Sequence, residues 1–315
     1  MRACVLSGGS NKGIAQVGFI RAIHNHDPEL DYDLFCGLSV GSINAAFLAT
    51  GPLKETLPQL EKMWFEKVKG NHSVWQHHLM NYIIFDIVVI LLFTIAAFIS
   101  FILTAPKLLT LFLGFCALAC FYLPYYTVGH THSVYKTDPL KKLINDGLDL
   151  NKLKSSGKKL RVGAVSFTTG KYHVATEQDD NIKDWIMASS SFPLFFPMPF
   201  IDGEYWVDGG LTSIALLHEA LELGATEIDI ILTSPMKVDP YSGHPGIIKQ
   251  LVRDLDIVSA EMFKKDLTNF TNIKVRVFMP EKTLTSNSLN FDPVRLKRMY
   301  VECRTLGEKI VNVVS

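Results

Sequence analysis

The chain has 315 residues, of which 48% are hydrophobic and 20% are charged, and its 31 basic and 31 acidic side chains give no net charge. A chain this apolar is excluded from the intrinsically disordered class, which needs low hydrophobicity and high charge. Non-specific binding to nucleic acid is not expected either, because that binding depends on an excess of positive charge.

The N-terminal part alternates short apolar runs with helical patterns. Residues 3–6 predict a buried strand that runs into the turn Ser7-Gly8-Gly9, and this apolar run is too short for a secretory signal, so none is expected. The same criteria then predict, in chain order, a helix at 12–26, a strand at 34–38 and helices at 42–50 and 57–68.

After residue 130 the alternation continues. We expect helices at 138–146, 181–190, 214–223, 247–265 and 293–313, and strands at 160–167, 171–176, 205–207, 227–233 and 273–278. Strands that alternate with helices predict an α/β fold, a three-layer sandwich around a largely parallel central sheet. We treat residues 1–315 as one such domain with a single apolar insertion.

The insertion is the stretch 79–130, where Asp86 and Lys107 are the only formal charges. Two uncharged runs, 87–105 and 108–128, are each long enough to cross a bilayer, which takes about 20 residues. We therefore predict a transmembrane helical hairpin at 81–128, with helices at about 83–105 and 108–128. A buried helix pair that covers the sheet is the alternative, but such helices normally keep a polar stripe.

The flanks of the hairpin are richer in positive charge than its turn. The turn carries Lys107 alone, whereas the flanking lysines are Lys67, Lys69, Lys136, Lys141, Lys142, Lys152, Lys154, Lys158 and Lys159. A hairpin returns the chain to the side on which it started, so the positive-inside rule places the globular domain in the cytoplasm. Aromatic residues near the expected helix ends fit a membrane interface: Trp75, Tyr82, Tyr122, Tyr125 and Tyr126.

The segment Gly37-Leu38-Ser39-Val40-Gly41 has the pattern GxSxG between a predicted strand and a predicted helix. In a sharp strand-to-helix turn, side chains at the two glycine positions would collide, and the serine hydroxyl stands exposed above the sheet. The N-terminus of the following helix favours negative charge that develops nearby. We interpret Ser39 as a candidate nucleophile.

The segment Gly8-Gly9-Ser10-Asn11-Lys12-Gly13 joins a strand to a helix start, where consecutive N–H groups can bind an anion. Two nucleotide-binding patterns fit it poorly. The P-loop needs Lys-Ser or Lys-Thr at its end, and the dinucleotide fingerprint GxGxxG fails at Ser10. An oxyanion hole for ester chemistry is the better use of this loop.

A third motif, Asp208-Gly209-Gly210, follows a short strand, and its carboxylate suits the activation of a serine. Alone, it would be read as an ordinary turn aspartate. A Ser39, Asp208, His244 triad has the chain order of α/β-hydrolases, but only about 38 residues precede Ser39 and His244 lies in an ordinary loop. We favour a Ser39–Asp208 dyad.

Together these motifs resemble the patatin-like phospholipase family over roughly residues 1–78 and 131–235. Residues 6–13 look like the family's glycine-rich loop, 37–41 like its nucleophile turn, 188–197 like the stretch before its second catalytic residue, and 208–210 like its aspartate motif. Two departures are visible: Ser10 stands where the family usually has a third glycine, and the asparagine-rich, proline-containing run that often follows the aspartate motif is absent. The apolar hairpin is not a general family feature.

The resemblance implies that the chain is a lipid acyl hydrolase of the phospholipase A or lysophospholipase type. Asp208 would take the proton of Ser39, an acyl-serine would form and be hydrolysed, and the N–H groups of Gly8, Gly9 and Ser10 would hold the oxyanion. Residues with supporting roles in the motifs would be Lys12, Gly13, Gly37, Gly41, Gly209 and Gly210. Lys12 would support the loop or contact an anionic head group.

The expected partners are a membrane phospholipid or lysophospholipid and the bilayer, with no nucleic acid. No metal or other cofactor is expected, although five histidines flank the insertion and a metal site there is the alternative to solvated interfacial side chains: His72, His77, His78, His130 and His132. Two other functions stay open: a weakly active or inactive lipid-binding scaffold, and an esterase or transacylase of neutral lipids.

Overall fold

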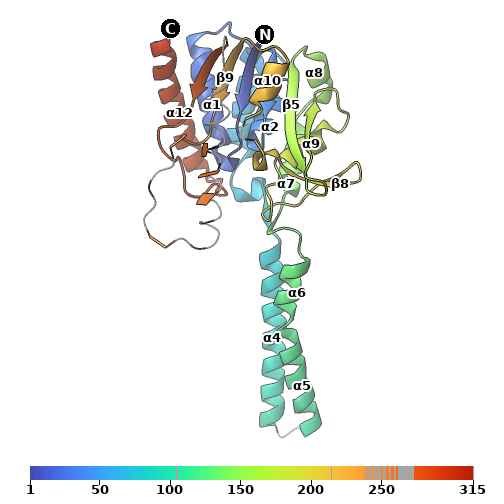
Figure 1. Cartoon of the computed structure of the whole chain (residues 1–315). Helices are drawn as coiled ribbons and strands as arrows, with labels where there is room; N and C mark the ends of the chain where they lie inside the picture. Colours follow the sequence, from blue (N-terminus) through green and yellow to red (C-terminus); the bar gives the residue numbers. More distant parts are fainter. Residues whose placement is uncertain are drawn as a thin grey trace. The chain divides into compact units, whose positions relative to one another are not determined.

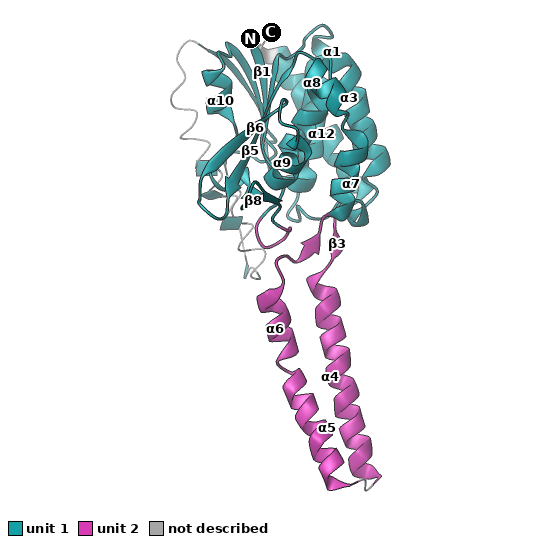
Figure 2. Ribbon diagram, turned by 90° about the vertical axis from the view of Figure 1, so that its right-hand side faces the viewer, with its two compact units in different colours: residues 1–74, 138–192, 198–315 teal, residues 75–137, 193–197 magenta. Residues whose placement is uncertain are grey.

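A computed structural model of the chain describes residues 1–103, 106–213, 215–237, 240, 243–244, 246, 250, 253–254, 257–258, 260–261 and 273–314. The chain divides into two compact units, which Figure 2 shows in different colours. Unit 1 comprises residues 1–74, 138–192 and 198–315, and unit 2 comprises residues 75–137 and 193–197. The apolar insertion of the sequence thus forms most of a unit of its own.

Unit 1 is built on an eight-stranded mixed sheet in the order β10-β9-β1-β2-β5-β8-β7, with β6 paired to β5. The five strands from β10 to β5 run parallel, and β6, β7 and β8 are joined to the sheet by antiparallel pairing. The strands are β1 (Arg2–Leu6), β2 (Leu34–Gly37), β5 (Lys159–Ser166), β6 (Tyr172–Thr176), β7 (Phe200–Ile201), β8 (Glu204–Asp208), β9 (Glu227–Ile231) and β10 (Lys274–Phe278).

Helices cover both faces of this sheet, which gives the three layers of the α/β fold. One face carries α1, α3 and α12, and α10 lies on the other (Figures 1 and 2). The α-helices of unit 1 are α1 (Gly13–His26), α2 (Val40–Leu48), α3 (Leu53–Lys62), α7 (Asp138–Gly147), α8 (Leu150–Ser155), α9 (Ile182–Ser189), α10 (Leu217–Glu222) and α12 (Pro293–Val314). Short helical turns are η1 (Ser10–Lys12), η2 (Met63–Lys67), η3 (Asn71–Ser73) and η4 (Gly209–Leu211).

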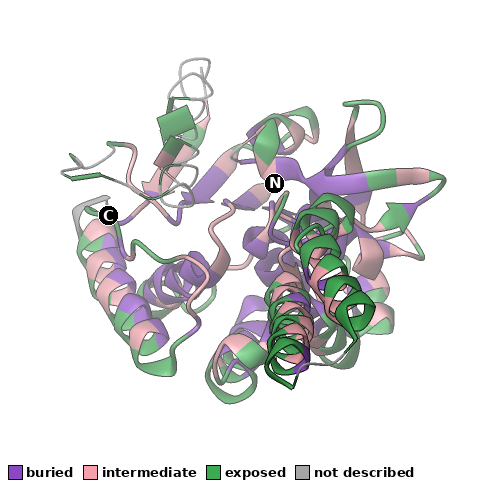
Figure 3. Ribbon diagram, turned by 90° about the horizontal axis from the view of Figure 1, so that it is seen from below, coloured by how far each residue is buried: buried purple, intermediate pink, exposed green. Residues whose placement is uncertain are grey.

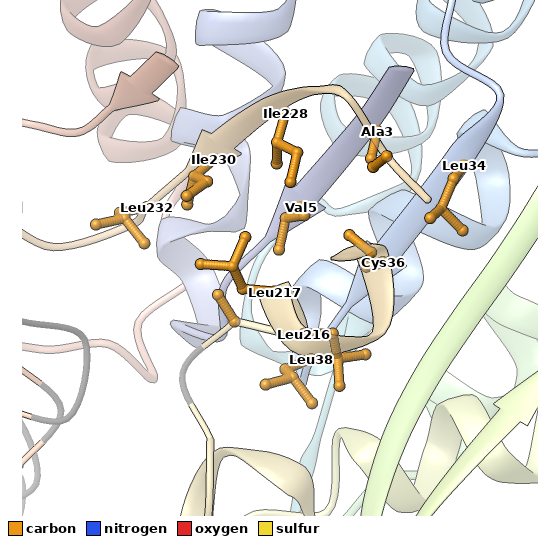
Figure 4. Close-up of a cluster of buried hydrophobic side chains, with 13 residues drawn as sticks. Ala3, Val5, Leu34, Cys36, Leu38, Leu216, Leu217, Ile228, Ile230 and Leu232 are labelled. Carbon is orange, nitrogen blue, oxygen red and sulfur yellow. The ribbon is translucent and has the colours of Figure 1, made fainter. Parts of the chain in front are cut away.

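The core on the α10 side explains why the central strands read as continuous apolar runs. Side chains of β1, β2 and β9 pack there against Leu216, Leu217 and Ala220, all of which are almost fully buried (Figure 4). Strands buried on both faces keep no polar face, unlike those of a half-solvated antiparallel sheet. The parallel register sets the loops after β1, β2 and β9 side by side at one edge, because carboxyl ends of parallel strands share an edge.

A charge pair between a half-buried guanidinium and a buried carboxylate joins two neighbouring strands of this sheet. The Arg276 guanidinium of β10 contacts the Asp229 carboxylate of β9 through two hydrogen bonds of 2.6 Å, and the Tyr32 hydroxyl donates to the same carboxylate at 2.6 Å. Asp229 is 4% exposed at its side chain. The carboxylate therefore has its charge and most of its lone pairs satisfied away from water.

Unit 2 is a long helical hairpin: α4 (Leu79–Ile102), α5 (Lys107–Cys120) and α6 (Leu123–His130), with the two-residue strands β3 (Gln76–His77) and β4 (Tyr135–Lys136) at its root. Two 24-residue stretches, Leu79–Ile102 and Lys107–His130, are long and apolar enough to cross a membrane. Few of their residues are buried within the structure, and Figure 3 shows these helices largely as exposed or intermediate.

Two polar contacts join the helices of the hairpin. Thr127 of α6 donates a hydrogen bond of 2.7 Å to the Asp86 carboxylate of α4, and the hydroxyls of Ser100 and Thr110 lie 2.9 Å apart. Asp86 and Ser100 are the buried residues of α4. The two buried polar residues of α4 therefore each have a hydrogen-bond partner on the opposite arm of the hairpin.

The structure differs from the sequence-based ranges in ways that have local causes. The second apolar run, expected as one helix, is interrupted at residues 121–122, because Pro124 has no N–H to continue the helical hydrogen bonds. The helix expected at 57–68 begins at Leu53 and ends as the π-helical turn η2. The short helix α8, capped by the Asp149 carboxylate, was not predicted. The helix expected at 247–265 lies largely outside the described residues.

The burial of the Asp229 carboxylate beside Arg276 leads to a prediction about stability. Arg276→Ala leaves the Asp229 charge buried with only the Tyr32 hydroxyl, so the free energy of unfolding should fall by about 3–5 kcal/mol. Urea unfolding in detergent micelles, followed by tryptophan fluorescence, measures it. The matched control is Arg2→Ala, which breaks the more exposed Arg2–Glu227 pair and should cost at most about 1 kcal/mol. Equal losses in the two variants would contradict this reading.

Candidate active site

Ser39 occupies the sharp turn between β2 and α2. Its backbone has φ 52° and ψ −129°, a conformation that non-glycine residues rarely adopt. The two glycines of the motif are needed for close backbone approach: a Cβ at Gly37 would lie 2.3 Å from the Gly41 carbonyl oxygen, and one at Gly41 would lie 2.4 Å from the Leu6 carbonyl oxygen. Ser39 itself is only half-buried, so its hydroxyl can be reached from solvent.

The strained peptide of Ser39 is held from outside its own turn. Its N–H donates to Ser189 Oγ at 3.0 Å, and Ser190 Oγ donates to its carbonyl oxygen at 3.2 Å. Ser42 Oγ donates to the same carbonyl at 2.6 Å. The serine run ahead of Phe192 therefore fixes the conformation of the candidate nucleophile.

Asp208 ends β8 and faces Ser39 from the antiparallel side of the sheet. Its N–H donates to the Ser191 carbonyl at 3.0 Å, and its Oδ1 accepts from the Gly210 N–H at 2.8 Å. Asp208 is 3% exposed, and its carboxyl lies near enough to the Ser39 side chain for that hydroxyl to favour its charged form. Burial raises the pKa of Asp208 from 3.8 to about 6, against the opposing effect of the Ser39 side chain and of the hydrogen bond from the Gly210 N–H.

The glycine-rich loop after β1 lies directly against Ser39. A Cβ placed on Gly8 would be 3.1 Å from Ser39 Cβ and 3.7 Å from Ser39 Oγ. The backbone N–H groups of Gly8, Gly9 and Ser10 donate to no acceptor in the part of the chain that the structure describes. Three consecutive unused donors in a loop whose Gly8 lies against Ser39 are suited to bind a developing oxyanion.

The loop is held firmly along its length. Thr233, which follows β9, donates from Oγ1 to the Gly8 carbonyl at 2.5 Å, and its N–H donates to Ser7 Oγ at 3.1 Å. Lys12 is 4% exposed, and its Nζ donates to Ser234 Oγ at 2.6 Å. This burial makes Lys12 a support of the loop, and Gly13 begins α1 directly after it.

Both ends of the loop are tied together by a chain of buried amide side chains. Trp64 Nε1 donates to Asn44 Oδ1 at 2.9 Å, and Asn44 Nδ2 donates to Gln16 Oε1 at 2.8 Å and to the Gly13 carbonyl at 3.0 Å. Gln16 Nε2 then donates to the Ser7 carbonyl at 2.7 Å. Satisfied buried networks of this kind specify one conformation.

Ser10 has a positive φ of 53°, which a glycine would adopt without strain. The family to which the sequence is similar usually has glycine at this place, and the backbone conformation explains why. The residues on both sides of Ser10 are held by hydrogen bonds, through the Gly8 carbonyl and the Asn11 side chain.

The sequence predicted the candidate catalytic and oxyanion-hole residues of this site. It did not predict the residues that hold them in place. Thr233, Gln16 and Asn44 were missed, as was the role of Ser189 and Ser190. For Thr233 a signal existed: it ends the strand expected at 227–233, and the loops that follow parallel strands meet at one edge of a sheet. His244 is exposed, and the described contacts of Ser39 do not include it. Among the described residues, no group of three or more His, Cys, Asp or Glu side chains is placed to hold a metal.

A family model described as patatin-like phospholipase matches residues 4–221. A solved structure, the crystal structure of VipD from Legionella pneumophila, aligns with 99% of this chain at 15% sequence identity and a TM-score of 0.42. This chain covers 66% of that structure's chain. No curated protein matches the sequence significantly.

The raised pKa of Asp208 generates a prediction about pH. Only the carboxylate form can accept the Ser39 proton, so labelling of Ser39 by a fluorophosphonate should slow about tenfold per pH unit below pH about 6. Labelling rates between pH 4.5 and 8 measure this, with Asp208→Asn as the variant that should not label at any pH. A midpoint near pH 4 would contradict the effect of burial.

The raised pKa of Asp208 also makes the free energy of unfolding depend on pH. Because the folded-state pKa of Asp208 lies above that of the unfolded chain, its stabilising contribution is full below pH about 4 and is lost as pH rises through about 6. The Asp208→Asn variant should lack this part of the pH dependence of the unfolding free energy.

Proposed function

We infer the activity from one premise: the chain belongs to the patatin-like phospholipase family, whose domain implies lipid acyl hydrolysis in general. We propose that it is a membrane-anchored hydrolase of phospholipids or lysophospholipids that uses a Ser39–Asp208 dyad. The observation that carries the proposal is that the Ser39 side chain lies beside the buried Asp208 carboxyl and against Gly8 of a loop in which the Gly8, Gly9 and Ser10 N–H groups donate to no described acceptor.

The proposed reaction has two halves. Asp208 accepts the proton as Ser39 Oγ attacks the ester carbonyl carbon, and the N–H groups of Gly8, Gly9 and Ser10 bind the oxyanion of the tetrahedral intermediate. The carbon–oxygen bond to the alcohol then breaks, and the alcohol leaves with the proton from Asp208. Water, deprotonated by Asp208, hydrolyses the acyl-serine and releases the fatty acid.

The buried carboxyl suits this role because its pKa of about 6 lies near neutral pH. It is ionised when the reaction begins, yet it is a stronger base than an exposed aspartate. The hydrogen bond from the Gly210 N–H keeps Oδ1 oriented, which leaves the carboxyl's other lone pairs for Ser39.

We propose that unit 2 is a two-span bilayer hairpin and that unit 1 lies in the cytoplasm. Support comes from two 24-residue apolar helices with few buried residues and from the lysines on the flanks of the hairpin against the single Lys107 in its turn. A tether of this kind would keep the enzyme at the surface that holds its substrate.

A lipid-binding scaffold without turnover is the second candidate, and the observation that favours it is the positive φ of Ser10 in the loop. Fluorophosphonate labelling of Ser39 would argue against it. An esterase or transacylase of neutral lipids differs in head group and acceptor alone, and a panel of lipid substrates separates it from a phospholipase.

The central test is hydrolysis of phosphatidylcholine and lysophosphatidylcholine in vesicles by the full chain. Ser39→Ala and Asp208→Asn should each lower fatty-acid release by at least about 10³-fold, since each removes a group that acts in the transition state. Matched controls are Ser155→Ala and Asp146→Asn, which change exposed residues of α8 and α7. Equal release by wild type and Ser39→Ala would sink the proposal.

The hairpin is tested separately by alkaline carbonate extraction of membranes from expressing cells. The full chain should stay in the pellet because removing two apolar spans from lipid is very costly. A variant in which a short Gly-Ser linker replaces residues 79–130 should move to the supernatant. Release of the full chain by carbonate would show that it is not membrane-spanning.

A further inference from the structure

Asn11 lies in the middle of the glycine-rich loop, and all of its hydrogen-bond donors are used by one distant segment. Its Nδ2 donates to the carbonyl oxygens of Asn287 at 3.0 Å and Asn290 at 2.7 Å. Its backbone N–H donates to the Ser288 carbonyl at 3.1 Å. Asn11 is 0% exposed, so these bonds are protected from competing water.

The segment that accepts these bonds, Leu284–Asp292, is itself well fixed. Leu284 and Phe291 bury its two ends. Between them, the Asn287 N–H donates to Thr285 Oγ1 at 3.1 Å, and Asn287 Oδ1 accepts from the Leu289 N–H at 3.2 Å. Such local side-chain-to-backbone bonds hold turns in one conformation.

Two further contacts tie this segment to neighbouring elements of unit 1. The Phe291 N–H donates to Asn71 Oδ1 of η3 at 2.8 Å, and Arg298 of α12 donates to the Leu284 carbonyl at 3.0 Å. The segment therefore presents its carbonyl groups to Asn11 from a rigid base.

The position of Asn11 matters because Ser10 precedes it. Ser10 has a positive φ of 53°, a conformation that costs about 1–2 kcal/mol for a residue with a Cβ. A free loop would relax toward negative φ, which would reorient the peptide groups on both sides of Ser10. Fixing Asn11 on one side and Gly8 on the other keeps the peptide in the strained conformation.

We propose that Asn11 is a positioning residue for the oxyanion hole. The segment Leu284–Asp292, which we call the clamp, accepts the hydrogen bonds that hold Asn11 in place. This inference rests on the proposed function. The clamp lies outside residues 4–221, which the family model matches. The C-terminal part of the chain thus completes the site, and its hydrogen bonds to Asn11 offset the backbone strain of Ser10. Asn11 acts through the direction of backbone N–H groups and has no contact with the substrate.

The test compares Asn11→Leu with wild type on lysophosphatidylcholine, using the full chain in micelles. The leucine keeps the volume of the side chain but has neither amide donor. We expect kcat to fall about 10²-fold with KM changed by less than about twofold, because a misdirected oxyanion donor weakens the transition state and not substrate binding. The inhibition constant of a trifluoromethyl ketone, whose adduct with Ser39 carries the same oxyanion, should rise by a similar factor.

Two controls separate positioning from general stability. Arg276→Ala destabilises unit 1 without touching the loop and should keep kcat within about threefold of wild type at a temperature where it is folded. Asn145→Leu places the same substitution at an exposed asparagine of α7. If Asn11→Leu does not fold, Asn11→Ser removes the same two donors with a smaller polar side chain and should show the same loss of kcat.

Three results would overturn the inference: kcat of the Asn11 variants within about threefold of wild type, a loss confined to KM, or an equal loss in Arg276→Ala. If wild type hydrolyses lipid and the Asn11 variants are equally active, the proposed role of Asn11 and the clamp is wrong, while the proposed function stands. If wild type has no more activity than Ser39→Ala, the proposed function fails and the clamp has no oxyanion to serve.

Discussion

The close approach of two backbone turns is the constraint on which the site depends. The loop after β1 and the turn after β2 leave neighbouring parallel strands and meet with no side chain between them: Gly8 lies against Ser39, and Gly41 lies against the Leu6 carbonyl. A Cβ at Gly41 would require one of the two turns to move. The space saved brings the loop backbone against Ser39, which the proposed oxyanion hole requires and which a loop with ordinary side chains could not do.

Such an arrangement is strained, and the surrounding structure has to maintain it. Ser39 and Ser10 both have positive φ, and each is flanked by hydrogen bonds from distant parts of unit 1. The serine run before Phe192 holds the first, and Thr233 with the Leu284–Asp292 clamp holds the residues beside the second. A strained backbone conformation costs about 1–3 kcal/mol per residue, and it persists only where contacts with neighbouring residues hold the backbone in place. Asp208 is positioned in the same way, through the Ser191 carbonyl and the Gly210 N–H.

The parts of this site that depend on local sequence could be predicted, and those that depend on long-range packing could not. The α/β class followed from strand and helix periodicity, and the GxSxG and Asp-Gly-Gly motifs follow from turns that tolerate no side chain. The amide contacts of Asn11 lie 276 and 279 residues away in the chain, and no periodicity marks them. The interruption of the second apolar helix follows from Pro124, which the prediction of one continuous helix at 108–128 did not take into account. The helix expected at 247–265 lies largely outside the described part of the chain.

The closed root of unit 2 explains how a family domain can carry so long an insertion. β3 and β4 pair antiparallel, with Gln76 opposite Lys136 and His77 opposite Tyr135, so the chain leaves and rejoins at adjacent points. The Val134 and Tyr135 N–H groups donate to the carbonyls of Leu194 and Phe195 at 2.9 Å, and Trp75 packs on Tyr135 with ring centroids 4.1 Å apart. An insertion whose ends are joined this way adds little loop-closure entropy to the fold that receives it. The sequence between Ser39 and Asp208 can therefore gain a hairpin while the strands that bear both residues keep their register.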